Sequence, residues 1–307
     1  MSSDRFIRIK PEIQSDLAAG KPVVALESTV IAHGLPHPQN IETARRLEQI
    51  ARAEGVTPAT IAVLDGLLCV GLDRPQLDQI ATRQDIKKLS VRDLAIAVAR
   101  KWNGATTVAS TMWIAHRAGI HVFATGGIGG VHRGSLPDVS ADLPQLAQIP
   151  MIVVCSGAKI VLDLPATREW LETNSITVVG YQCDEMPAFY SRSSGLPIDV
   201  RCDTPEEVAH LFATQRHLEV QSALLVTVPV PSEAEVEQSF LNTVLEDALG
   251  QAERNKISGR DLTPFLLAQM SERSDGATLR ANIALLEKNA RVAAQIANAL
   301  IEVSGIE

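Results

Sequence analysis

Four places in the sequence put chemically capable side chains where buried strands are expected to end. They are Glu27 in VVALEST, the glycine-rich stretch FATGGIGGVHRG at 123–134, Asp138 with Asp142 in LPDVSADL, and Lys159 in VVCSGAK. Ligands of open α/β sheets bind beyond the carboxyl ends of the strands. These positions are therefore candidates for a site, although each also has a plainer structural interpretation.

Lys159 stands where the apolar run 151–155 ends and a helix is expected to begin, directly after Ser156, Gly157 and Ala158. Burying an ammonium ion is costly unless the group is paired or deprotonated. A lysine held by small residues in a dry pocket becomes a neutral amine, which forms Schiff bases with carbonyl-type carbons. The alternative is a side chain that extends from the helix start into water.

Glu27 ends the apolar run 23–26. It is either a structural acid satisfied by hydrogen bonds or a general acid or base whose pKa is tuned by its site. Asp138 and Asp142 are four residues apart, so a helical turn would place both carboxylates on one face, an arrangement that suits a hard divalent ion. Capping of a helix by Asp138 or Ser140 explains the same spacing.

The glycines of the stretch 123–134 leave backbone N–H groups open to an anion. The stretch is no Walker A loop, because no GK[ST] follows, and His132 takes the last glycine place of GxGxxG. Glycines of this kind predict a turn as readily as a phosphate site.

These residues need a sheet to position them, and apolar runs typical of buried strands alternate with stretches of helical period. Strands are expected at 22–29, 121–127, 151–155, 176–181 and 223–230, with two more around an Asp65-Gly66 hairpin in 60–72. Helices are expected at 38–54, 91–102 after the N-cap Ser90, 106–118 and 164–174, and the chain is mainly helical from 233 onward. The pattern predicts a three-layer α/β/α sandwich with a mixed central sheet. We expect one domain, residues 1–307, whose helical C-terminal portion packs on the sheet.

Composition narrows the classes of partner. The 307 residues carry a net charge of −8 without a basic stripe, which argues against nucleic acid or a membrane surface but leaves an anionic small molecule open. The four cysteines form no CxxC pair, so we expect buried free thiols in a reducing compartment. The first 27 residues lack the long apolar region of a signal peptide or anchor, and we expect a cytoplasmic protein.

Nine blocks of sequence, in order and with short gaps, resemble one family over roughly residues 10–300. They are VVALESTVIAHGLPHPQN, KLSVRDL, NGATTVASTM, HVFATGGIGGVHRG, DVSADL, VVCSGAKIVLDL, GYQ with PAFYSRSSG, TPFLLAQM, and LRANIALLEKNA. With them the chain resembles the pseudouridine-5′-phosphate glycosidases, whose family includes the indigoidine synthase A-like proteins. The visible departure is the short spacer SLP at 135–137.

The resemblance implies that pseudouridine 5′-phosphate and water are converted reversibly to uracil and ribose 5-phosphate, in pseudouridine catabolism. An ordinary glycosidase protonates a heteroatom leaving group between two carboxylates. Uracil leaves from carbon instead, so C5 of the base needs a proton and the sugar needs an electron sink. An amine at C1′ supplies that sink as the iminium of a ring-opened ribose.

Carried onto this sequence, the resemblance makes Lys159 the nucleophile at C1′ and Glu27 the proton donor. Asp138 would bind one divalent ion, Mn²⁺, through waters. Lys88 and the backbone at Val108 would hold the phosphate, as a compact ammonium suits a dianion. Asn282 would hold the uracil edge. The remaining substrate contacts would come from Ser140, Ala141, Asp142 and, more loosely, His132. The resemblance also implies a homotrimer.

Two alternatives stay open. A relative on the same scaffold could act in indigoidine biosynthesis or on another C-nucleoside phosphate, since the lysine and the glutamate would serve either reaction. A non-catalytic binder of sugar phosphates belongs to a different class. Such a binder needs no Schiff-base amine, so Lys159 and Glu27 argue against it.

Overall fold

The computed structural model describes residues 5–134, 138–257, 259 and 262–304, and the spacer SLP at 135–137 lies outside the described residues. Within them, the centre of the molecule is an 11-stranded sheet in the order β1-β4-β3-β2-β7-β8-β11-β9-β10, with β5 and β6 joined to it through β3. The strands are β1 (Ile7–Ile9), β2 (Val23–Leu26), β3 (Thr57–Leu64), β4 (Leu67–Val70), β5 (Lys87–Leu89), β6 (Gly104–Thr106), β7 (Val122–Ala124), β8 (Ile152–Cys155), β9 (Thr177–Tyr181), β10 (Val200–Cys202) and β11 (Leu224–Thr227).

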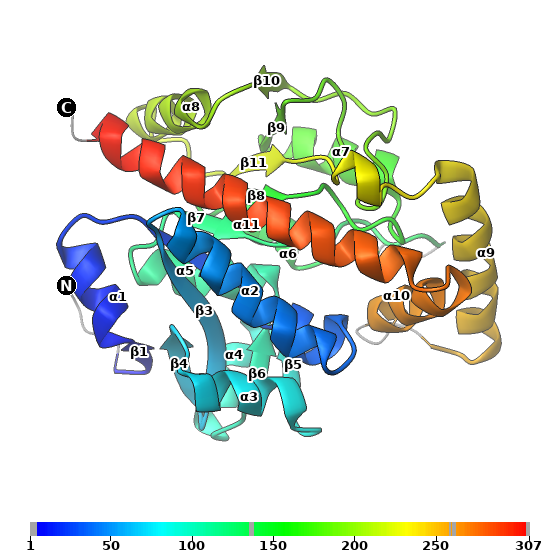
Figure 1. Cartoon of the computed structure of the whole chain (residues 1–307), viewed down its shortest axis with the longest axis horizontal. Coiled ribbons are helices and arrows are strands. Elements are labelled where there is room, and N and C mark those ends of the chain that lie inside the picture. The colour runs from blue at the N-terminus through cyan, green and yellow to red at the C-terminus, as the bar shows by residue number, and fades with distance from the viewer. Residues whose placement is uncertain (1–4, 135–137, 258, 260–261, 305–307) are drawn as a thin grey trace.

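Helices cover both faces of this sheet (Figure 1). The long α11 (Ala277–Ser304) lies beside α2 (Gln39–Ala53) and α8 (Pro205–His217) over one face, and α5 (Val108–Arg117) with α6 (Asp142–Leu146) lies on the other. The shorter helices are α1 (Pro11–Ala18), the π-helix η1 (Val30–Gly34), α3 (Arg74–Thr82), α4 (Val91–Ala99), α7 (Leu164–Thr173) and the 3₁₀ turn η2 (Ser232–Ala234). The predicted three-layer sandwich is confirmed.

The four central strands are apolar because both of their faces are covered. Every residue of β2, β7, β8 and β11 is buried, as parallel strands between two helical layers require. The register aligns Leu26 with Ala124, Ala124 with Val154, and Val154 with Val226. The residues that follow these strands therefore meet at one edge of the sheet.

Strand β3 makes the sheet mixed. Its first half runs parallel to β2, and its second half pairs antiparallel with β4 across a turn at Asp65 and Gly66. Both turn residues have positive φ, 49° and 76°, the type I′ geometry that Asp-Gly sequences favour. The hairpin predicted at this position is confirmed. Ser90 is the N-cap residue of α4, as predicted, but the cap bond runs from its N–H to the carboxylate of Asp93 at 3.0 Å, and its hydroxyl has no partner among the described residues.

The helix predicted at 164–174 is confirmed as α7, but no helix begins at Lys159 itself, so the expectation of a helix start there is wrong. Asp163 caps α7 with its side chain. Before it, Ala158 forms a parallel bridge with the glycine-rich stretch, and Gly157 has a φ of +82°, which no right-handed helix accepts. Lys159 therefore lies in irregular chain between a strand and a helix.

The C-terminal portion is helical, as predicted. Helix α9 (Gln238–Arg254) packs against α10 (Leu262–Arg273) at one end of the molecule, and α11 then returns across the sheet (Figure 1). No helix in the described part of the chain is long and apolar enough to cross a membrane.

Candidate active site

A cavity of about 410 Å³ is lined by residues that follow β2, β7 and β8 and by parts of α4, α5, α10 and α11. Every residue that the sequence analysis assigned to a site lines this cavity. They are Glu27, Lys88, Val108, His132, Asp138, Ser140, Ala141, Asp142, Lys159 and Asn282. The structure thus brings together positions up to 255 residues apart in the chain, while their individual roles stay predictions.

Glu27 follows β2 and is only 7% exposed. Its carboxylate accepts a short hydrogen bond from the hydroxyl of Thr125, which follows the neighbouring strand β7. Burial raises the pKa of Glu27, and the charges of Lys159 and Lys88 together with the Thr125 hydrogen bond oppose that rise without cancelling it. The carboxyl group therefore keeps its proton to a higher pH than an ordinary glutamate, as a proton donor requires.

Asp142 is the first residue of α6 and is almost fully buried. One carboxylate oxygen accepts a hydrogen bond from the N–H of Ala109 at 2.8 Å, and the other accepts one from Gly129 at 2.8 Å. Both oxygens are thus occupied by backbone donors, which fix the carboxylate between α5 and the glycine-rich stretch.

Asp138 and Asp142 do not share a helix face, so the geometry expected from their spacing is wrong. Helix α6 begins only at Asp142, and Asp138 precedes it in extended chain, where Val139 bridges to Val131. Asp138 does not cap the helix either, because the N-cap position is Ala141. Of the two capping residues considered, Ser140 is the one that contacts the helix start, where its hydroxyl accepts the N–H of Asp142 at 3.3 Å.

A metal ion bound at Asp138 would have few ligands from the protein. Asp138 is exposed at the cavity. Among the described residues, no three His, Cys, Asp or Glu side chains gather in a way that could hold a metal ion. A single carboxylate fits a hydrated divalent cation that keeps most of its waters and meets substrate oxygens. It does not fit a closed site made of protein ligands alone.

The glycine-rich stretch lies between the segment of Asp142 and the segment of Lys159. Ser140 donates its N–H to the carbonyl of Gly130 at 2.9 Å, and Ile128 accepts from the N–H of Lys159 at 3.1 Å. A Cβ at Gly129 would lie 2.1 Å from Ser140 Oγ and 2.7 Å from Asp142 Oδ2. Glycine at 129 is therefore required for close packing, which a turn alone would not demand.

Lys159 is half-buried, and its side chain lines the cavity. Two backbone hydrogen bonds to the glycine-rich stretch, from Lys159 to Ile128 and from Ile128 to Gly157, hold its position. The thiol of Cys155 nearby is no competing nucleophile, because burial raises its pKa to about 12. All four cysteines are free, as predicted.

The start of α5 forms the polar end of the cavity with Lys88. The N–H of Ala109 is used by Asp142, and the side chain of Thr107 accepts from Ser110. Within the described residues, the N–H of Val108 makes no hydrogen bond. A helix N-terminus with a free N–H beside a lysine favours an anion such as a phosphate.

The opposite wall comes from the C-terminal helices. Asn282 of α11 is buried beside the glycine-rich stretch, where a Cβ at Gly126 would lie 3.6 Å from its amide oxygen. Sequence reasoning missed three lining residues of α10, Thr263, Pro264 and Leu267. The block TPFLLAQM contains them, but nothing in its pattern indicates a contact with a distant strand end.

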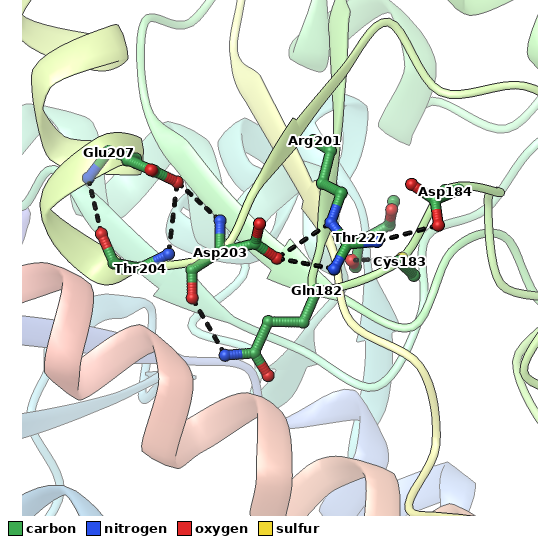
Figure 2. Close-up of polar contacts among 8 residues, drawn as sticks. All are labelled: Gln182, Cys183, Asp184, Arg201, Asp203, Thr204, Glu207 and Thr227. Atoms are coloured by element: carbon green, nitrogen blue, oxygen red, sulfur yellow. Dashed lines mark hydrogen bonds and ion pairs between the residues drawn. The ribbon is translucent and has the colours of Figure 1, made fainter.

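Other strand ends carry polar residues that bind one another instead of lining the cavity (Figure 2). Arg201 of β10 forms ion pairs with Asp184 at 2.8 Å and with Asp203 at 2.9 Å. Gln182, directly after β9, donates to the carbonyl of Asp203 at 3.0 Å. A polar residue at a strand end is therefore only a candidate until the sheet order is known.

Comparison with known proteins finds similarity along nearly the whole chain. A family model described as indigoidine synthase A like protein matches residues 12–299. A protein of Methylobacterium nodulans named pseudouridine-5′-phosphate glycosidase is 51% identical over 292 residues, which cover 94% of this chain and 87% of that protein. A protein of the same name from Caldanaerobacter subterraneus is 47% identical over 296 residues, which cover 96% of each chain.

Solved structures agree with these sequence matches. The crystal structure of the prealnumycin C-glycosynthase AlnA in complex with ribulose 5-phosphate has a TM-score of 0.91 at 36% identity, and covers 99% of this chain and 100% of that one. An indigoidine synthase A-like protein from Thermotoga maritima has a TM-score of 0.89 at 38% identity, and covers 96% of this chain and 97% of that one.

Proposed function

The chain belongs to the indigoidine synthase A-like family and is an enzyme, and from that premise we propose that it reversibly cleaves the C–C glycosidic bond of pseudouridine 5′-phosphate. The products are uracil and ribose 5-phosphate. Relatives 44–51% identical to it carry the name pseudouridine-5′-phosphate glycosidase. We place the reaction in the breakdown of pseudouridine.

One observation carries the proposal. The same cavity holds an amine, Lys159, and a carboxyl group, Glu27, whose pKa is raised by burial. A protein that only binds sugar phosphates has no use for this pair. An enzyme that must protonate carbon and stabilise an electron-poor C1′ needs both.

The first half of the reaction opens the sugar. The phosphate binds near Lys88 and the first turn of α5, so that C1′ lies by the amine. Glu27 gives a proton to the ring oxygen as the O4′–C1′ bond breaks, and the amine nitrogen of Lys159 forms a bond to C1′ and passes a proton to the Glu27 carboxylate. The substrate is then an open-chain ribose phosphate attached to both uracil and the enzyme.

The second half releases the base. The C1′–C5 bond breaks, its electron pair stays with uracil, and Glu27 gives C5 the proton that it received from the Lys159 nitrogen. The lone pair of the Lys159 nitrogen forms the C=N bond of an iminium at C1′, which replaces the lost carbon bond. Water then adds at C1′ and the C–N bond breaks, which returns the amine and ribose 5-phosphate and consumes one water overall.

We include a divalent ion at Asp138 in the proposal, with Mn²⁺ as the first candidate because oxygen ligands suit it. When bound, the ion would neutralise negative charge on the substrate. Asp138 would hold it through a single carboxylate, and Asp142 would stay committed to its two backbone donors.

The homotrimer and the cytoplasmic location also remain part of the proposal, on the strength of the family resemblance. Light scattering on the purified protein should give three times the chain mass of 33.0 kDa. A mass of one chain at assay concentration would remove the trimer from the account.

A second candidate substrate has one observation in its favour. A neighbour with the same fold is a C-glycosynthase whose structure contains ribulose 5-phosphate. A C-nucleoside phosphate with a base other than uracil is therefore the alternative, and it would use the same amine and carboxyl group.

The assay for the proposal is release of uracil from pseudouridine 5′-phosphate, followed by chromatography. Uridine 5′-phosphate, which carries the same base on nitrogen, serves as the control substrate, and Lys159→Ala as the control enzyme. We expect uracil from the first substrate only, and none with the variant. Equal release from both substrates, or release by the variant equal to that of the parent, would overturn the proposal.

A further inference from the structure

Asn289 of α11 is fully buried, although the residues packed around it on that helix, such as Leu285, Leu286 and Ala293, are apolar. A buried amide costs free energy unless its hydrogen bonds are made. Its NH₂ group donates to the carbonyl of Thr125 at 2.9 Å and to the hydroxyl of Ser156 at 3.1 Å.

Both partners belong to segments that carry the reacting groups. Thr125 follows β7, and its hydroxyl donates to the carboxylate of Glu27. Ser156 follows β8, three residues before Lys159, and its N–H donates to the carbonyl of Gly126 at 2.9 Å. The amide of Asn289 therefore links the end of β7, which binds Glu27 through Thr125, to the end of β8, which leads to Lys159.

We infer that Asn289 is a positioning residue that fixes the separation of Glu27 and Lys159, an inference that rests on the proposed function for its catalytic meaning. Asn289 does not line the cavity and so does not touch substrate. It acts through the Thr125 carbonyl and the Ser156 hydroxyl. Misplacement of a reacting group by about 1 Å can cost on the order of 100-fold in rate.

The same helix offers a matched comparison. Asn298 is also an asparagine of α11, and it donates one hydrogen bond to the carbonyl of Glu54 at 2.8 Å. Glu54 lies outside the cavity. Asn298 thus links α11 to the end of α2 without contact to the ends of β7 or β8. Its replacement therefore shows the effect of losing such a link on stability, separately from any loss of positioning.

The experiment compares Asn289→Ala with Asn298→Ala in the uracil-release assay, together with their melting temperatures. For Asn289→Ala we expect kcat to fall about 10- to 100-fold with KM within about threefold of the parent value. Asn298 is half-buried and makes one hydrogen bond. For Asn298→Ala we therefore expect a smaller loss of melting temperature and a kcat within about twofold of the parent. Equal kcat in the two variants would overturn the positioning role.

A measurement without substrate separates this inference from the proposed function. The Thr125 hydrogen bond lowers the pKa of Glu27, so loosening Thr125 should move the carboxyl titration of Glu27 upward, as read by carbon NMR. We expect that upward shift in Asn289→Ala and not in Asn298→Ala. If the parent released no uracil but Asn289→Ala still showed the upward shift, the proposed function would fail while the positioning of Glu27 stood. If the parent released uracil and Asn289→Ala showed neither the shift nor a loss of kcat, Asn289 would have no positioning role.

Ser156→Ala is the milder test should Asn289→Ala not fold. It removes only a hydroxyl and leaves the bond from Asn289 to the Thr125 carbonyl in place. We expect kcat to fall at least about threefold with KM unchanged, since the link to the Lys159 segment is weakened. An unchanged kcat in this variant would contradict the inference.

Discussion

At the residue scale, the protonation state of Glu27 should control the activity, and it can be measured directly. Burial raises its pKa against the opposing charge of Lys159 and the hydrogen bond from Thr125. A carboxyl group that donates a proton must be protonated when substrate binds. Activity in the cleavage direction should therefore fall as the pH rises through this raised pKa.

Glu27→Gln removes the proton and keeps the shape, so we expect kcat to fall by about 10²- to 10⁴-fold.

The stability of Glu27→Gln should also depend less on pH than the stability of the parent. A raised pKa in the folded state stabilises the parent at low pH, and this contribution is lost as the pH rises from the ordinary value of 4.5 through the raised one. The free energy of unfolding of Glu27→Gln should therefore gain on the parent across that window, in denaturant titrations.

Glu48→Gln is the matched control for the loss of kcat predicted for Glu27→Gln. Glu48 also has a pKa raised by burial and also accepts a hydrogen bond from a threonine, Thr60, at 2.6 Å. It lies on α2, outside the cavity. Its replacement should leave kcat within about twofold of the parent. A loss of activity as large as that of Glu27→Gln would mean that burial, and not the site, explains the effect.

The divalent ion gives a second prediction at the residue scale. Treatment with a chelator should lower the rate, and added Mn²⁺ should restore it, because one exposed carboxylate holds a hydrated ion only weakly. Asp138→Ala should lower the apparent affinity for Mn²⁺ in a titration of activity. A rate that chelation leaves unchanged would remove the ion, and with it the role of Asp138.

At the element scale, most of the positioning comes from three irregular segments, which are the glycine-rich stretch, residues 138–141 and residues 156–159. These segments are harder to predict from the sequence than the strands before them. The strands before Glu27 and Lys159 follow from their apolar runs, and the hairpin follows from Asp65-Gly66. The placement of Lys159 outside a helix does not, because it depends on Gly157 and the glycine-rich stretch in three dimensions. Strands of three residues, such as β5 and β6, are also too short for a periodic pattern.

Gly129→Ala tests the packing of these segments. The added Cβ would lie within 2.7 Å of both Ser140 Oγ and Asp142 Oδ2, so the segment 138–142 must shift. We expect kcat/KM to fall at least about tenfold, since positioning errors near 1 Å are costly. Gly250→Ala in α9 is the control, because its Cβ would meet only the end of Arg254 at 3.4 Å. Equal activity of both variants and the parent would contradict the role given to the stretch.

At the scale of the whole molecule, the cavity exists because the sheet order makes β2, β7 and β8 neighbours. The sequence predicts that polar residues follow strands, but the order of the strands decides which of them meet. Glu27 and Lys159 share a cavity, whereas Gln182 and Asp203, which directly follow β9 and β10, bind other residues outside it (Figure 2). The ends of apolar runs indicate Glu27 and Lys159 as candidates, whereas only the family resemblance points to Lys88, Val108 and Asn282.

We also propose that residues 1–307 form one domain. Helix α11 contacts β2, β7 and β8 in the centre of the sheet, and α2 and α8 on either side (Figure 1). An element shared by both halves of a sheet favours cooperative unfolding. Calorimetry should show a single transition, and two well-separated transitions would contradict the single domain.

The central claim is that Lys159 bonds to C1′ of the sugar phosphate, and chemical trapping tests it most directly. The enzyme is incubated with ribose 5-phosphate and borohydride, digested, and mapped by mass spectrometry. We predict one labelled peptide, with the mass of ribose 5-phosphate less one oxygen atom on Lys159. A label on Lys88 instead, or no label from an enzyme that releases uracil under the same conditions, would contradict the account.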